Sequence, residues 1–215
     1  MSTFSLDFSA ILAAISPTEI MGATGVALGS TWALFRSRRT ILACQAMGSI
    51  AFCIHYILLG SPTAAISCAM SVVQSVAGYS GRRPPWLGPL YIATYLVVVC
   101  GAILTWHGLP SGFVIAAAFF AALGRWQTNP QRMRLVFLFC SMNWAMHNSL
   151  VGTVFGLTSD TIALSTISYG LWRNRTVGPV EAVRQMAGSA VETLRSAASA
   201  CLEAPRLLAR SVSAR

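Results

Sequence analysis

Residues 36–60, which read RSRRTILACQAMGSIAFCIHYILLG, decide the fold class that this sequence predicts. The stretch opens with three arginines and continues as a largely apolar run from residue 41 to Gly60. Roughly 20 helical residues, at about 1.5 Å each, cross the hydrocarbon core of a bilayer. An apolar run of this length beside a basic cluster is typical of a transmembrane helix that enters from the cytoplasmic side.

The composition of the whole chain agrees with this interpretation. Hydrophobic residues make up 55% of the 215 positions and charged residues only 10%, and the mean hydropathy is +0.63. Such a chain has too little polar surface to cover a water-soluble domain, so we expect the lipid bilayer to be its main partner. The net charge of +9 comes from arginines at the ends of apolar runs and in the tail. We therefore interpret the arginines as topology signals and expect no nucleic-acid partner.

Hydropathy and breaker residues predict seven transmembrane helices in an all-α, polytopic membrane protein. The predicted runs are 19–35, 41–60, 63–80, 87–106, 111–127, 134–151 and 154–172. Glycine and proline separate several of them, as at Gly60 with Pro62 and at Gly108 with Pro110.

The arginines alternate along these runs. They follow the first, third, fifth and seventh runs, at Arg36, Arg38, Arg39, Arg82, Arg83, Arg125, Arg132, Arg134, Arg173 and Arg175. The loops after the second, fourth and sixth runs contain none. Because short cytoplasmic loops are enriched in basic residues, this pattern predicts an amino terminus outside and a carboxyl terminus in the cytoplasm. It also places Arg125, Arg132 and Arg134 around the loop after the fifth run.

An internal repeat is predicted by a shift of 92 positions. The shift aligns identical residues at Ser49 and Ser141, His55 and His147, Leu58 and Leu150, Gly60 and Gly152, Ser67 and Ser159, and Gly78 and Gly170. Residues 19–80 and 111–172 then form two parallel three-helix repeats, joined by a linker helix at 87–106. Small-solute carriers use this arrangement, with the repeats related by an axis along the membrane normal. Duplication of a structural bundle that does not transport is the alternative.

Two terminal segments flank the helices. Residues 1–18 contain Asp7 and no basic residue, so they lack the positive region of a cleavable signal peptide. We expect them to remain as an extracytoplasmic segment. Residues 176–215 combine apolar residues at helical spacing with an excess of arginine over glutamate. They predict a cytoplasmic amphipathic helix on anionic lipid, with a partner-binding or disordered tail as the alternative.

Polar residues inside the predicted spans supply the candidate site. Ionisable groups at membrane depth are costly, so they normally face the bundle interior or a water-filled cavity. His55 and His147 each lie five residues before the glycine that ends their run, and Asp160 lies at a comparable depth. Together they could hold a cation, bind a polar solute or pass a proton, because histidine titrates near neutrality. The alternative for each histidine is a hydrogen bond that only holds two helices together.

Other polar residues accompany these three. Asn143 lies one helical turn before His147, and Trp144 and Asn148 are close by in the sequence. A tryptophan at this depth can also anchor the helix at the interface. A hydroxyl stripe in the last run could line a polar path or form a helix-packing seam; it consists of Thr158, Thr161, Ser165 and Ser168.

The remaining chemistry predicts neither an enzyme nor a cofactor. The six cysteines form no CxxC pair, and five of them lie in apolar runs, where we expect free thiols. Two histidines and one carboxylate could bind zinc, but no local ligand spacing supports a metal site. No nucleophile, metal motif or phosphate loop has convincing spacing.

Two stretches resemble the YgjV-type bacterial inner membrane protein family. They are ILACQAMGSIAFCIHYILLGSPTAA in the first half and SMNWAMHNSLVGTVFGLTSDTIALSTISYGLWR in the second, and the resemblance covers residues 19–175. It implies the bacterial inner membrane as the location. It also implies an acidic residue at Asp160 and a basic residue where this chain has Gln74. The same plan of three, one and three helices looks like that of SWEET-type sugar carriers and PnuC vitamin transporters, an architectural similarity only.

These observations favour a small-solute transporter or channel-like protein. We expect a small polar or cationic solute to pass a layer formed by His55, His147, Asn148 and Asp160. A non-transporting membrane scaffold or sensor is the alternative. The sequence does not decide between a monomer and a homo-oligomer.

Overall fold

The computed structural model describes residues 16–173. The predicted segment before residue 16 and the predicted tail at 176–215 lie outside the described residues. The described part contains helices and no strand, so the predicted all-α fold class is confirmed. Its elements are α2 (Pro17–Gly29), η1 (Trp32–Leu34), α3 (Arg38–Leu58), α4 (Pro62–Gly78), α5 (Leu87–Leu104), α6 (Leu109–Trp126), α7 (Pro130–Val151) and α8 (Val154–Arg173).

Local sequence signals explain where the helices begin and end. Proline stands in the first turn of α2, α4, α6 and α7, where its missing N–H costs nothing. The Asn129 side chain caps α7 by accepting from the backbone N–H groups of Gln131 and Arg132. Gly152, with φ of 76°, ends the same helix in the left-handed region that glycine adopts without strain.

The first predicted run, 19–35, is not one continuous helix. The α-helix ends at Gly29, and the chain continues through the short 3-10 helix η1. The Ser30 hydroxyl at this break lies 2.8 Å from the Ser159 hydroxyl of α8 and is fully buried. A contact with a distant helix therefore accompanies the break, and hydropathy alone could not predict it.

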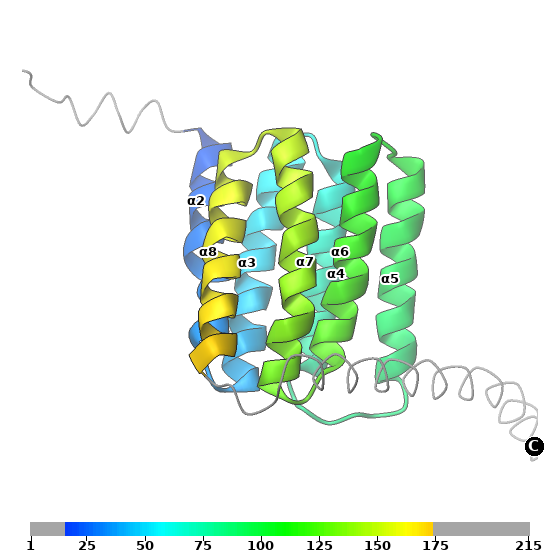
Figure 1. Cartoon of the computed structure of the whole chain (residues 1–215). Helices are drawn as coiled ribbons and strands as arrows, with labels where there is room; N and C mark the ends of the chain where they lie inside the picture. Colours follow the sequence, from blue (N-terminus) through cyan, green and yellow to red (C-terminus); the bar gives the residue numbers. More distant parts are fainter. Residues whose placement is uncertain (1–15, 174–215) are drawn as a thin grey trace, which may run out of the picture.

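The helices stand side by side in one bundle (Figure 1). In the first half α3 packs against α2 and α4, and in the second half α7 packs against α6 and α8. The halves meet where α2 contacts α8 and where α6 contacts α4, while α5 packs on α4 and α6. Three helices of the second half begin 92 positions after three of the first, at Pro17 and Leu109, Arg38 and Pro130, and Pro62 and Val154.

The outer surface of the bundle is apolar, as a membrane protein requires. Large hydrophobic side chains such as Ile57, Val76 and Ile103 are exposed on it. By length and composition, α3, α5 and α6 are each able to cross a membrane. The arginines of the described residues belong to the end of the bundle where α2, α4, α6 and α8 finish. We call this end the arginine end.

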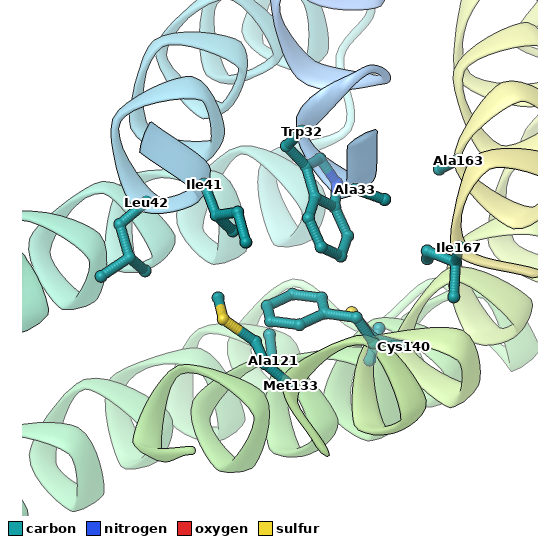
Figure 2. Packing of buried hydrophobic residues seen from close by; sticks show 11 residues of the cluster. Trp32, Ala33, Ile41, Leu42, Ala121, Met133, Cys140, Ala163 and Ile167 are labelled. Atoms are coloured by element: carbon teal, nitrogen blue, oxygen red, sulfur yellow. The ribbon is translucent and has the colours of Figure 1, made fainter. Parts of the chain in front are cut away.

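A hydrophobic cluster fills the bundle near the arginine end. Trp32 and Ile41 from the first half point toward Met133 from α7 (Figure 2). The Trp32 ring meets the edge of Phe137, with 5.0 Å between ring centroids. Aromatic and aliphatic side chains from both halves thus share one buried core.

Two arginines join the halves at this end, and we call them the crossed arginine clamps. Arg38 of α3 donates through Nη2 to the Arg125 carbonyl at 2.8 Å and through Nε to the Gln127 carbonyl at 3.2 Å. These carbonyls end α6 and would otherwise have no helical partner. Arg38 also donates to the Gly78 carbonyl, at 2.5 Å, where α4 ends.

The second clamp runs in the opposite direction. Arg134 of α7 donates through Nε to the Ala33 carbonyl at 3.0 Å and through Nη2 to the Phe35 carbonyl at 2.7 Å. Each clamp therefore starts in one half and binds carbonyls of the other. Arg134 binds the carbonyls of Ala33 and Phe35. Arg38 binds the carbonyls of Arg125 and Gln127, which lie 92 positions later in the sequence.

Arg125 and Arg134 lie in the helices on either side of the short loop between α6 and α7. Arg125 belongs to the last turn of α6, and α7 already begins at Pro130, so Arg134 is helical as well. Both side chains are buried. These guanidinium groups are accommodated inside the bundle because polar partners surround them.

Candidate functional site: a polar cavity in the centre of the bundle

A cavity of about 120 Å³ lies between the two halves of the bundle. Its walls come from both halves, and most lining residues have a counterpart 92 positions away that also lines it. Such pairs include Ser49 and Ser141, Phe52 and Trp144, Tyr56 and Asn148, and Cys68 and Asp160. The cavity therefore lies where positions that are 92 residues apart in the sequence come together.

A chain of three buried polar side chains forms one wall of the cavity. The Tyr56 hydroxyl donates to Oδ1 of Asn148 at 2.7 Å, and Nδ2 of Asn148 donates to Oδ2 of Asp160 at 2.7 Å. The three residues come from α3, α7 and α8, so the chain connects the halves. Trp144 stacks on the Tyr56 ring, with 5.7 Å between centroids and 18° between planes.

Gly156 of α8 allows this chain to form. A Cβ atom at Gly156 would lie 2.5 Å from the amide carbon of Asn148, closer than any side chain could tolerate. The glycine therefore lets the Asn148 amide lie directly against α8, one helical turn before Asp160. A larger residue at this position would displace the amide that holds the carboxyl group.

The cavity also contains a buried cation. Arg125 is 3% exposed and donates through Nε to the Ser75 hydroxyl and through Nη1 to Oε1 of Gln74, both at 3.0 Å. Its guanidinium lies 5.5 Å from the centre of the Phe137 ring. The resemblance implied a basic residue at Gln74; here Gln74 is instead the acceptor for an arginine from a neighbouring helix.

Gln45 of α3 is the least satisfied polar residue that lines the cavity. It is 5% exposed, and neither its amide nitrogen nor its amide oxygen has a hydrogen-bond partner in the described part of the chain. A buried amide without partners is expensive, and an unmade hydrogen bond of this kind costs about 1–3 kcal/mol. Such groups are few in native proteins, and a bound water, ion or ligand is one of the explanations for them.

The two predicted histidines bind backbone instead of the cavity. Nδ1 of His55 lies 2.9 Å from the Thr18 carbonyl and its Nε2 lies 3.1 Å from the Thr153 hydroxyl. Nδ1 of His147 lies 3.0 Å from the Pro110 carbonyl, whereas its Nε2 is buried without a partner. Neither residue lines the cavity. The two rings hold equivalent helix starts, because Thr18 and Pro110 are again 92 positions apart.

The other predicted site residues divide into two groups. Trp144, Asn148 and Asp160 line the cavity together. Asn143 does not join them, because its amide donates to the Phe139 carbonyl of its own helix at 2.8 Å. The hydroxyl stripe of α8 also lies apart from the cavity: its members are exposed, and three of them, Thr158, Thr161 and Ser165, bond to carbonyls of their own helix.

Tyr56, Gln45 and Arg125 line the cavity but were absent from the sequence-based candidates. Tyr56 could have been found from its position 92 residues before Asn148, and Gln45 from its amide inside an apolar run. Arg125 gave a misleading signal, since a charge at the end of a run is usually a loop residue. Cys68 and Cys140 line the cavity as free thiols. Within residues 16–173 no group of three or more His, Cys, Asp and Glu side chains is arranged to hold a metal ion.

Comparison with known proteins agrees with the apolar surface of the bundle. A family model described as a bacterial inner membrane protein, Imp-YgjV, matches residues 17–177. No curated protein and no solved structure gives a significant match to the chain. The matched region includes all the helices described above and every residue of the cavity. The chain belongs to the Imp-YgjV family of bacterial inner membrane proteins.

Proposed function

We propose that this protein is a small-solute transporter or channel-like protein of the bacterial inner membrane. The central cavity, with Asp160 on one wall and Arg125 on another, is the solute site. The observation that carries this proposal is the buried, unpartnered amide of Gln45 in a cavity that also contains two charged side chains. A bundle that only needed to pack would fill this space with apolar side chains.

The arrangement of the halves supports the same conclusion. In our proposal seven helices cross the membrane, and α2, α3 and α4 are equivalent to α6, α7 and α8. The Tyr56 hydroxyl bonds to Asn148, its own counterpart, and two equivalent residues meet only near the axis that relates the halves. In carriers built from repeats, the solute site lies at the interface between the repeats.

The direction of the chain in the membrane follows from the charges. The arginine end faces the cytoplasm in this proposal, because cytoplasmic loops carry an excess of basic residues. The amino terminus is then outside and the carboxyl terminus inside. The crossed arginine clamps lie at this end, and in our proposal at least one clamp opens when a solute passes to the cytoplasm.

A membrane scaffold or sensor is the second candidate, and the histidines favour it. Both rings bind backbone carbonyls at the start of a neighbouring helix, which is a structural role. If the rest of the polar network served the same purpose, no solute would cross. We propose no enzymatic activity in either case, and both functions are compatible with a monomer or a homo-oligomer.

An uptake experiment separates the two candidates. Metabolites taken up by cells that express the protein are compared, without a preselected list, with those taken up by cells that lack it. Asp160→Asn should abolish the difference while the variant still inserts and folds. Thr161→Val is the matched control, because Thr161 is exposed on the same helix and bonds only to Leu157. Uptake that survives Asp160→Asn, in a variant with reduced folding, would support the scaffold instead.

A further inference from the structure

The cavity has two oppositely charged poles, neither of which is neutralised by the protein. Asp160 is 8% exposed, and its hydrogen bond comes from the neutral amide of Asn148. The side-chain hydrogen bonds of Arg125 go to a hydroxyl and an amide oxygen, which are also neutral. In the described part of the chain, therefore, neither buried charge has a counter-ion. Buried charges in proteins are normally paired, because desolvation without pairing is very costly.

Gln45 adds to the positive pole. In the proposed alignment of the halves it is the counterpart of Phe137, the residue over which the Arg125 guanidinium lies. Both Gln45 and Arg125 line the cavity. The two N–H donors of the unpartnered amide and the guanidinium are suitable donors for a carboxylate that enters it.

The distance between the poles follows from helix geometry. Asp160 lies six residues into α8, whereas the Arg125 guanidinium binds Ser75, thirteen residues into α4. Both helices start at the end opposite the arginine end, so the two levels differ by roughly 10 Å along the bundle axis at about 1.5 Å per residue. With charge-assisted hydrogen bonds of about 2.8 Å at each pole, a ligand that reaches both poles spans at least about 4 Å.

On the basis of the proposed function, we infer that the cavity binds a small zwitterion of the amino-acid class. Its ammonium group binds Asp160, and its carboxylate binds Arg125 and Gln45. A small amino acid is the simplest kind of molecule that carries both groups. The cavity volume of about 120 Å³ is large enough to hold several water molecules and therefore a ligand of this size.

Neither single charge would satisfy this site. A cation alone would neutralise Asp160 and leave Arg125 and Gln45 unpaired, and an anion alone would leave Asp160 unpaired. A zwitterion pairs both poles without adding net charge to the centre of the bundle. The site should therefore discriminate strongly against methylammonium and acetate, although each contains one of the required groups.

Equilibrium binding to the full-length protein in detergent tests the inference. The probes are radiolabelled glycine and β-alanine, with methylammonium and acetate as competitors. We expect at least one amino acid to bind and neither ion to compete at equal concentration. Asp160→Asn and Arg125→Gln should each weaken binding about 10- to 100-fold, the effect of losing one hydrogen bond to a charged group. Thr161→Val should leave binding unchanged.

Charge-conserving variants distinguish a loss of ligand binding from a loss of folding. Asp160→Glu and Arg125→Lys should restore part of the binding, which a purely structural role would not predict. Competition by methylammonium or acetate as strong as that by the amino acids would overturn the inference, and so would a wild-type protein that binds neither amino acid. If the uptake comparison nevertheless finds another solute that depends on Asp160, the zwitterion inference fails and the proposed function stands. If it finds no such solute, both fail.

Discussion

Replacement of Arg38 by Met should destabilise the protein far more than replacement of its neighbour Arg39. The guanidinium of Arg38 donates to carbonyls of Gly78, Arg125 and Gln127, at 2.5, 2.8 and 3.2 Å. These carbonyls end α4 and α6, so a single side chain closes two helix ends. Arg39 is exposed and makes none of these contacts, although it belongs to the same turn of α3.

The size of the effect follows from these three bonds. A hydrogen bond to a charged group contributes about 1.5–3 kcal/mol, and a carbonyl at the end of a helix recovers part of that energy from water when the donor is lost. Arg38 is only partly buried, so we take the lower half of the range and expect a total loss of about 3 kcal/mol. For a chain of this length such a loss lowers Tm by roughly 6–12 °C.

Thermal unfolding of the purified variants in one detergent, followed by circular dichroism, measures this difference. Arg39→Met should unfold within about 1–2 °C of the wild type, because exposed substitutions usually change stability by less than about 0.5 kcal/mol. Equal Tm values for Arg38→Met and Arg39→Met would refute the clamp. The helix ends of α4 and α6 would then not be held by this side chain.

Two further predictions concern packing and topology. A Cβ atom at Gly48 would lie 2.4 Å from the Gly29 backbone, so Gly48→Ala should lower Tm clearly. A Cβ atom at Gly88 would meet nothing closer than 3.6 Å, so Gly88→Ala should be neutral or stabilising. The same unfolding assay compares the two variants, and equal Tm values would argue against the close approach of α2 and α3. Reporter fusions after Gly60 should be active only outside the cytoplasm, and those after Gly81 only inside it; a cytoplasmic reporter at Gly60 would reject the proposed topology.

Much of the fold could be predicted because the signals for it are local. Apolar runs and the prolines and glycines between them locate each helix to within a few residues. The exceptions are informative. The break after Gly29 accompanies a contact with Ser159 on a distant helix, and the early start of α7 depends on the Asn129 cap, since the arginines near its start suggested a loop.

The site was predicted less completely, because polarity at membrane depth does not indicate which way a side chain points. Asp160 and Asn148 were among the candidates and line the cavity, whereas His55 and His147 bind backbone carbonyls beside it. Asn143 is as polar as Asn148 but bonds within its own helix. Only the packing of the two halves distinguishes these cases.

The most direct test of the central claim, that the cavity between the halves is a solute site, is the uptake comparison carried out with two variants of neighbouring residues. Asp160 lines the cavity, whereas Thr161 is exposed on the same helix. The account predicts that Asp160→Asn abolishes the uptake that the wild type confers and that Thr161→Val leaves it unchanged, with both variants inserted at the wild-type level. Equal uptake by the wild type and Asp160→Asn would contradict the account.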